Sequence, residues 1–488
     1  MTFSLSMLRT LDSPAPAVKA KSRPPFPFDT SVGRALSFPP NWHRMKTIPL
    51  KWIVQGFLAA VVIAFALLLF IYPAAVLARL MLDRDLRRTG ESPLFARGFE
   101  SAAPRYLSWA TDYLDTQQAA TFHHDNVAAT EWPMFGSVFF LVTAEDLHAQ
   151  GRIDATQGDL RAAVDKAAEV VVSPVTATWV RTKWGDSYLN RENVFYRMLL
   201  ILGLSSYETI TGDPRHHALM SAQRAGLAQE LAAAPRHLLD DYPGECYPND
   251  ILWAVAAIQR AARLDNTNHA DLACGLMADF DGPVRSPQGL PACQMDSRSG
   301  RILQNARGCV NSGILMFAGE LDPVIADKWY RAYETYFWKD NGWIAGFSEM
   351  PRGTCPEFMD VDSGPVLFDF GSVASAFGIG AAKAAGRLDH AVPLTLEAVA
   401  CSWPTPFGFL IPGFLGRVAA DGSCLGEIAL LFSMTRPLRG LEVVPFAGRI
   451  PGCVWLLLLA YAGIGIFLIA SEIRSCRRLF SRRQPRVQ

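Results

Sequence analysis

The chain has 488 residues, and its 46 basic and 46 acidic side chains give a formal net charge of zero. This balance argues against nucleic-acid binding, which depends on a strong local excess of positive charge. Half of the residues are apolar, a high share that indicates membrane segments added to an otherwise ordinary globular composition.

Residues 1–48 hold many prolines, serines and basic side chains, without apolar periodicity. A segment of this composition cannot bury enough apolar surface to offset its loss of chain entropy. We therefore predict a disordered leader. The positive-inside rule, applied to the basic C-terminal tail, places this leader in the cytoplasm.

The first hydrophobic stretch runs from Trp52 to Ala78 without a charged residue. Because about 20 helical residues cross a hydrocarbon core of roughly 30 Å, it predicts a transmembrane helix over 50–80. A cleaved signal peptide is the alternative, but its apolar core would be shorter and nearer the terminus.

Between the hydrophobic stretches, residues 92–445 alternate Ala-rich segments of helical period with glycine and proline turns. We count about twelve helices and little strand-like alternation. Helices in pairs without visible sequence repeats predict an all-α fold, an α/α six-hairpin barrel or toroid. In such a barrel the ligand site lies at one end, where loops enter the inner helices. The clearest expected helices are 134–149, 157–171, 192–211, 214–233, 250–263, 323–336 and 366–387.

The second hydrophobic stretch, from Cys453 to Ala470, is followed by the arginine-rich tail 474–488. It predicts a transmembrane helix over 453–473, with a buried core helix as the alternative. Under the positive-inside rule the tail stays in the cytoplasm, and two crossings return the leader to the same side. We expect the barrel outside the cytoplasm, on the cell (inner) membrane.

Seven of the nine cysteines fall in the expected barrel region, and their spacing forms neither a CxxC pair nor a zinc-ligand pattern. We therefore assign no disulfide, no metal site and no other cofactor.

The first chemical motif joins a histidine and aspartate cluster, His123 to Asp125, to Glu131 and Trp132. So many polar and aromatic residues in one loop are typical of a site wall. The alternative is structural, because an acid just before a helix with proline in its first turn favours the positive helix end.

The second motif places Glu192 and Tyr196 one turn apart at a helix that Asn190 caps. This spacing fits either a structural helix start or a catalytic pair on one helix face.

The third motif is Cys246-Tyr247-Pro248-Asn249-Asp250, directly before an apolar helix. Asp250 is either a helix-start acid or a site residue. A cysteine behind a glycine is poorly placed for a core, and its thiol can serve as an acid or a base.

The fourth motif is Asp360-Val361-Asp362-Ser363-Gly364, which leads into a helix rich in small residues. Alternation places both carboxylates on one side of an extended segment. Paired carboxyls tend to separate in pKa, which acid/base chemistry can use, although solvated acids at a turn are the simpler alternative.

In their order along the chain, these motifs resemble the linalool dehydratase/isomerase family over residues 100–435. The resemblance is carried by Trp184-Gly185-Asp186, Glu192 to Tyr196, Tyr207 to Gly212, Cys246-Tyr247-Pro248 and Leu321-Asp322-Pro323. It implies a periplasmic α/α six-hairpin barrel. It also implies removal or addition of water at a terpene alcohol by acid/base residues, which in the family include cysteines, an aspartate, tyrosines and a histidine.

The match departs from the family at most of these acid/base positions. Cys246 aligns with one family cysteine. The following acid, the second cysteine, the histidine, a methionine and a later tyrosine fall here on Tyr247, Val255, Leu199, Phe195 and Cys309. The resemblance thus implies the fold more firmly than the chemistry, and linalool itself is not the expected substrate.

We therefore expect a membrane-anchored lyase or isomerase for a hydrophobic, terpenoid-like alcohol, with the bilayer and a small-molecule substrate as partners and the homo-oligomeric state open. The expected catalytic residues are Cys246, Asp250, Asp362, Glu131 and Tyr196. The expected substrate-binding residues are Asp125, Trp132, Phe195, Tyr247 and Cys309. The alternatives are a glycoside hydrolase, whose two carboxylates would flank the scissile bond, and a non-catalytic binding protein on the same fold.

Overall fold

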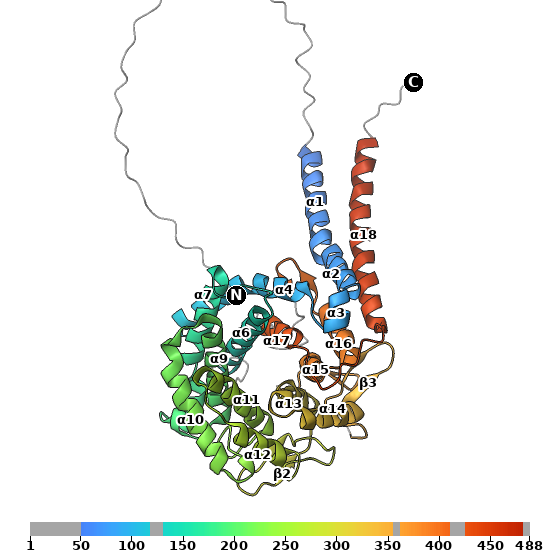
Figure 1. Cartoon of the computed structure of the whole chain (residues 1–488). Helices are drawn as coiled ribbons and strands as arrows, with labels where there is room; N and C mark the ends of the chain where they lie inside the picture. The colour runs from blue at the N-terminus through green and yellow to red at the C-terminus, as the bar shows by residue number, and fades with distance from the viewer. Residues whose placement is uncertain (1–49, 118–129, 355–361, 410–424, 482–488) are drawn as a thin grey trace, which may run out of the picture. The chain divides into compact units, whose positions relative to one another are not determined.

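The computed structural model of the chain describes residues 50–117, 130–354, 362–409 and 425–481 (Figure 1). The chain divides into two units, residues 1–54 and a compact unit of residues 55–488. Only Leu50–Val54 of the first unit are described. The predicted leader 1–48 and the candidate binding residue Asp125 lie outside the described residues.

Helices dominate the chain, as the sequence predicts, and the strands are short. The helical segments are α1 (Leu50–Ala66), the π-helical η1 (Leu67–Ile71), α2 (Tyr72–Met81), α3 (Arg84–Thr89), α4 (Pro93–Asp115), α6 (Trp132–Ala149), α7 (Gly158–Val172), α8 (Thr178–Trp184), η3 (Tyr188–Asn190), α9 (Val194–Thr211), η4 (Pro214–His216), α10 (His217–Ala233), η5 (Pro235–His237), α11 (Pro248–Asp265), α12 (Ala270–Phe280), α13 (Gly308–Leu321), α14 (Pro323–Phe337), α15 (Ser372–Ala384), α16 (Leu388–Cys401), α17 (Leu425–Thr435) and α18 (Gly452–Ser481). The strands are β1 (Gln294–Met295), β2 (Ile302–Gln304), β3 (Trp338–Asp340), β4 (Ala345–Phe347), β5 (Val366–Leu367), β6 (Phe370–Gly371), β7 (Pro404–Thr405) and β8 (Gly408–Phe409).

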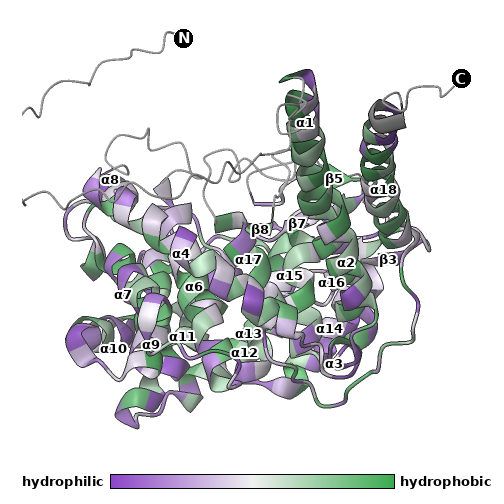
Figure 2. Cartoon of the chain, turned by 90° about the horizontal axis from the view of Figure 1, so that it is seen from above, coloured by the Kyte–Doolittle hydropathy of each residue, from purple (hydrophilic) through white to green (hydrophobic). Residues whose placement is uncertain are grey.

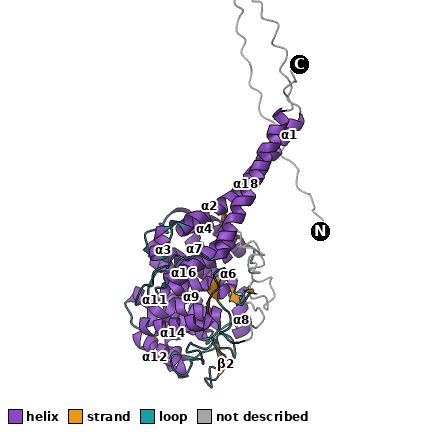
Figure 3. Ribbon diagram, turned by 90° about the vertical axis from the view of Figure 1, so that its right-hand side faces the viewer, coloured by secondary structure: helices purple, strands orange, loops and turns teal. Residues whose placement is uncertain are grey.

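The strands pair in order into antiparallel hairpins, β1 with β2 and so on to β7 with β8. These hairpins take up little of the mostly helical chain (Figure 3). One of them changes a predicted boundary, because the segment expected as a helix over 366–387 begins with the β5–β6 hairpin. Its two turn residues, Phe368 and Asp369, have φ of 50° and 68°, which suits a two-residue hairpin turn and excludes a helix. The helix starts only at Ser372.

Six inner helices form a closed cycle of neighbours. α6 packs against α9, α9 against α11, α11 against α13, α13 against α15, α15 against α17, and α17 again against α6. Figure 1 shows them following one another around a common centre. Their sequences are apolar on nearly every side, as helices surrounded by other helices require.

Six outer helices alternate with the inner ones along the chain. α7 packs on α6 and α9, α10 on α9, α12 on α11, α14 on α13, and α16 on α15, while α4 covers α17 and α7. The outer helices differ from the inner ones in that they bury one face. Helix α14, for example, buries a single stripe at the spacing of one helix face, Trp329, Tyr330, Tyr333 and Phe337.

Aromatic side chains fill the middle of the inner cycle. Phe139 of α6 stacks on Phe432 of α17 with ring centroids 4.3 Å apart, and Trp253 of α11 lies 4.7 Å from Phe317 of α13. All four are buried. The centre is therefore a packed core, and any site must lie at an end of the inner helices.

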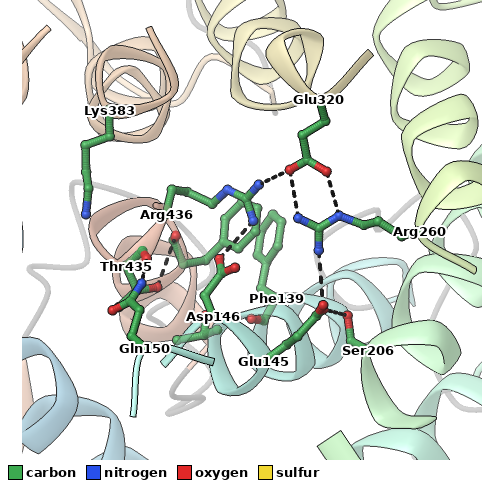
Figure 4. A network of polar contacts seen from close by, with 12 residues as sticks. Phe139, Glu145, Asp146, Gln150, Ser206, Arg260, Glu320, Lys383, Thr435 and Arg436 are labelled. Carbon is green, nitrogen blue, oxygen red and sulfur yellow. Dashed lines mark hydrogen bonds and ion pairs between the residues drawn. The ribbon is translucent and has the colours of Figure 1, made fainter. Parts of the chain in front are cut away.

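A buried charge network joins one end of the inner helices (Figure 4). Glu320 accepts two hydrogen bonds from Arg260, at 2.8 and 2.9 Å, and one from Arg436 at 2.8 Å. Arg436 also donates to Asp146 at 2.9 Å, and Arg260 to Glu145 at 3.3 Å. These residues lie at the C-terminal ends of α6, α11 and α13 and just after α17. The inner helices therefore run in one direction, and their N-termini share the opposite end.

Among the described residues, two helical stretches are long and apolar enough to cross a membrane, Leu50–Met81 and Gly452–Arg478. Their surfaces are strongly hydrophobic in Figure 2. Within the compact unit, α18 packs along η1 and α2, and the Gln55 side-chain amide donates to Ser475 at 3.2 Å. The π-helical turn η1 lies against Gly465, where a side chain would collide with Ile71.

Candidate functional site

The N-terminal ends of the inner helices carry most of the predicted site residues. Glu131 directly precedes α6, and its side chain does not cap that helix. Asp250 lies in the first turn of α11, which opens with Pro248. Both acids sit where the positive end of a helix dipole favours negative charge. The alternative of a simple helix-start role therefore still applies to Asp250, whereas the Glu131 side chain has another partner.

That partner is Tyr242, whose hydroxyl donates to Glu131 Oε1 at 2.8 Å. The loop that holds Tyr242 is tied at several points. The Asp241 amide donates to Glu245 O at 2.8 Å, the Gly244 amide donates to Asp240 Oδ2 at 2.9 Å, and Gly244 takes a positive φ of 85°. This turn fixes the phenol against the start of α6.

Glu131 is half-buried, and its pKa is raised to about 7. Burial is the largest cause. The hydrogen bond from Tyr242 opposes it, and the nearby charges of Asp362 and Asp250 raise the pKa further. A carboxyl with this pKa is present in both protonation forms at neutral pH, as general acid/base catalysis requires.

Asp250 has a similar electrostatic environment. Burial raises its pKa to about 7, the hydrogen bond from Asn249 at 2.9 Å lowers it, and the charge of Asp362 raises it. Asp241 lies beside it, fully buried, with a pKa raised by burial and by the charge of Asp250. Carboxyls that share a site in this way do not all ionise together, which separates their roles into acid and base.

An aromatic wall adjoins the carboxyls. Phe195 lies 5.8 Å from both Phe135 and Trp179, and 6.5 Å from Tyr242, between ring centroids. Trp132 stands edge-on to Phe135 at 5.7 Å. The predicted binding residues Trp132 and Phe195 thus lie with the carboxyl group, in surroundings that are largely apolar.

Cys246 lies behind this group rather than on its surface. Its side chain is fully buried, and its main chain pairs with Met295. Burial raises the pKa of the thiol well above its usual range, and the charge of Asp241 adds to the rise. The thiolate form, which a base or nucleophile needs, is therefore suppressed at neutral pH.

The remaining predicted residues divide between the site and its surroundings. Tyr247 donates to Glu245 at 2.9 Å, and its pKa is raised first by burial and then by groups that include Asp362. Tyr196 is buried against Tyr188 and Trp179, at 5.3 and 5.9 Å. Its raised pKa has burial and Tyr188 as causes, without any of the site carboxyls.

Cys309 also lies apart from the carboxyl group. Its thiol contacts Glu349 Oε1 at 3.1 Å, and Arg307 donates to the same oxygen at 2.8 Å. Burial and Glu349 raise the pKa of this thiol. The structure therefore brings together the charges of Glu131, Asp250 and Asp362. Nearby are the predicted binding residues Tyr247, Trp132 and Phe195. Tyr196 and Cys309 have other partners.

Two residues of the group, Asp241 and Tyr242, were missed by sequence reasoning. They lie in Asp240-Asp241-Tyr242-Pro243-Gly244, which the pattern presents as an ordinary proline and glycine turn. Two consecutive acids before a tyrosine, just ahead of Cys246, are the signal that could have indicated them.

One cluster outside this site has metal-ligand chemistry, since donor atoms of Glu334, Asp389 and His390 lie within 4.8 Å of one another. Arg387 already pairs with both carboxylates, at 2.5 Å to Glu334 and 2.7 Å to Asp389. The guanidinium supplies the positive charge that a metal ion would bring, so the cluster is an ion-pair network.

Comparison with known proteins gave no matching family model and no matching curated protein. The chemistry of the site therefore follows from its geometry alone. The described residues present two half-buried carboxyls with pKa values near 7, a third carboxylate close by, a phenol donor and an apolar aromatic wall. That set can donate and accept protons beside a hydrophobic substrate.

Proposed function

We propose that the chain is a membrane-anchored acid/base enzyme, a hydro-lyase or isomerase of the linalool dehydratase/isomerase type, that acts on a hydrophobic alcohol. The observation that carries the proposal is the pair Glu131 and Asp250, each half-buried and each with a pKa raised to about 7. Such a pair can hold one proton between two groups, which is the state that elimination of water needs.

In the dehydration direction the protonated carboxyl gives its proton to the substrate hydroxyl while the C–O bond breaks. The ionised carboxyl takes a proton from the adjacent carbon, and the C–H electron pair forms the new double bond. Water and an alkene leave. Tyr242 keeps Glu131 in place through their 2.8 Å hydrogen bond, and addition of water is the same path reversed.

The aromatic wall supports a hydrophobic substrate over a sugar. Phe135, Phe195 and Trp132 offer apolar contact, whereas a sugar site needs many hydrogen-bonding groups for its hydroxyls. A glycoside hydrolase remains the second candidate because three carboxyls, Glu131, Asp250 and Asp362, influence one another's charge.

The fold part of the proposal is that the inner and outer helices form one α/α six-hairpin barrel over 92–445. The closed cycle from α6 through α17 back to α6 supports it. We further propose that α1–α2 and α18 span the membrane and that the barrel faces away from the cytoplasm. The arginines after Ala470 support this orientation.

The test is product formation by the full chain in nanodiscs. Terpene alcohols and chromogenic glycosides are supplied in parallel, and alkenes, isomerised alcohols or free sugars are measured. We expect alkene or isomer from the alcohols, abolished in Glu131→Gln and Asp250→Asn. Matched controls are Glu100→Gln on α4 and Asp271→Asn on α12, which are exposed acids on outer helices. Sugar release alone would favour the hydrolase, and no product from either class would favour a binding protein.

A further inference from the structure

Two hairpin tips carry large hydrophobic side chains into solvent. Phe368 at the β5–β6 turn is 86% exposed, and Phe407 at the β7–β8 turn is 70% exposed. Leu367, beside Phe368, is half exposed at 47%. Isolated exposed apolar residues are common on proteins, so the position of these tips decides what their exposure means.

Both tips lie at the end of the barrel that carries the candidate site. The β5–β6 hairpin leads directly into the N-terminus of α15 at Ser372. The β7–β8 hairpin is tied to the N-terminus of α17, because the Phe409 amide donates to Glu427 Oε1 at 3.0 Å. The N-termini of α6 and α11, with Glu131 and Asp250, share this end.

The β7–β8 hairpin is also attached to the first spanning helix. The Trp403 indole donates to the carbonyl of Leu69 at 2.7 Å, and its ring lies 5.6 Å from Phe70 and 5.1 Å from Tyr461 of α18. Leu69 belongs to the apolar stretch Leu50–Met81 and Tyr461 to the apolar stretch Gly452–Arg478, and both stretches are long enough to cross a hydrocarbon core.

Trp403 and Tyr461 thus join the site end of the barrel to both candidate spanning helices, and aromatic side chains of this kind are enriched at membrane interfaces. The tip with Phe407 lies four residues beyond Trp403 along the chain. Figure 2 shows α1 and α18 leaving the unit on the side where β5, β7 and β8 are labelled.

The β5–β6 turn adds an independent observation. Phe368 and Asp369 both take left-handed backbone conformations, with φ of 50° and 68°, which favour Gly, Asn or Asp and are strained for a phenylalanine. A phenylalanine there gains nothing from packing, since its ring is exposed. Contact with lipid would supply the missing burial.

We propose that the tips of β5–β6 and β7–β8, with Leu367, Phe368 and Phe407, rest in the outer layer of the lipid bilayer and hold the site end of the barrel against the membrane. Together with the proposed function, on which this consequence rests, the arrangement lets a hydrophobic alcohol pass from the bilayer to the site without crossing water.

The experiment is photo-crosslinking to lipid, which requires no activity. Benzoylphenylalanine replaces Phe368, Phe407, Phe467 or Val324 in turn in the full chain, the variants are placed in phosphatidylcholine nanodiscs and irradiated, and lipid adducts are measured by mass spectrometry. Phe467 in the apolar part of α18, 68% exposed, is the positive control for lipid contact. Val324, 65% exposed, opens α14 at the charge-network end and is the matched negative control.

We expect adducts at 368 and 407 to approach the level at 467 and to exceed the level at 324 several-fold. Background adducts at both tips would overturn the proposal. Adducts at 407 alone would also overturn it, because only the hairpin beside the spanning helix would then touch lipid. Crosslinks to a second copy of the chain in place of lipid would assign the tips to a protein interface.

Discussion

The Tyr242 hydroxyl donates a hydrogen bond of 2.8 Å to Glu131 Oε1, although the two residues are 111 positions apart. The bond links the loop before α11 to the start of α6 and lowers the pKa of a carboxyl that burial raises. This bond therefore influences the protonation of Glu131.

We predict that Tyr242→Phe shifts the pH dependence of catalysis upward. Loss of the hydrogen bond removes stabilisation of the ionised Glu131, and such bonds to charged groups contribute about 1.5–3 kcal/mol, so the pKa should rise by about one unit or more. The pH profile of kcat/KM, compared with Tyr188→Phe as control, measures this. An unchanged profile would show that Glu131 does not titrate in catalysis.

We predict that stability falls as pH rises from about 4 to about 7. The pKa values of Glu131 and Asp250 are raised to about 7 in the folded chain, so their contribution is complete below their unfolded pKa values and is lost as pH rises through 7. Each should contribute about 1–3 kcal/mol at most. Melting temperatures at pH 5 and pH 8 should differ less in Glu131→Gln and Asp250→Asn than in the unsubstituted chain, whereas Asp271→Asn should leave the difference unchanged.

We predict that Glu320→Ala destabilises the fold by about 3–5 kcal/mol, the usual cost of leaving a buried charge without its partner. Glu320 pairs with Arg260, Arg436 and Arg439 at 2.8 to 3.1 Å. Chemical denaturation in detergent micelles measures the loss. Glu320→Gln keeps the shape of the side chain and removes its charge, so its stability should lie between that of the unsubstituted chain and that of Glu320→Ala. A loss below about 1 kcal/mol would mean that the arginines find water or other acceptors.

We predict that Cys246→Ser leaves the pH profile of product formation unchanged. The thiol is buried with a pKa well above its usual range, so it does not exchange protons near neutral pH. A slower rate with the same profile would indicate a packing defect. Loss of one limb of the profile would instead place the thiol in the proton path.

We predict that an alkaline phosphatase fusion near residue 300 is active and that one after Gln488 is inactive. The positive-inside rule keeps the basic tail in the cytoplasm, and the two spanning segments return the barrel to the other side. The opposite pattern would reverse the topology.

Much of the helical pattern could be predicted because it depends on local periodicity. Helices α6, α7 and α11 end within two residues of their predicted bounds. The β5–β6 hairpin could not, because the left-handed turn at Phe368 and Asp369 breaks residue preferences.

The candidate site was predictable only in part, for a similar reason. Glu131 and Asp250 were indicated by their places at helix starts. Tyr242 acts through a contact across 111 residues of sequence, and Asp241 through its burial beside Asp250. No local pattern separates such residues from a turn. Burial of Cys246 is likewise set by Met295 on a distant hairpin.

The π-helical turn η1 sets the rotational position of α1 relative to α18. Each residue turns an α-helix by about 100°, and a π turn accommodates one residue more than an α turn. If Leu67–Ile71 took regular α geometry without losing a residue, the preceding part of α1 would rotate by about a quarter of a turn. Gln55 would then point away from Ser475, while α2 kept its place, and deleting one residue from the segment would restore the alignment. The π geometry of this short segment therefore decides which face of α1 meets α18.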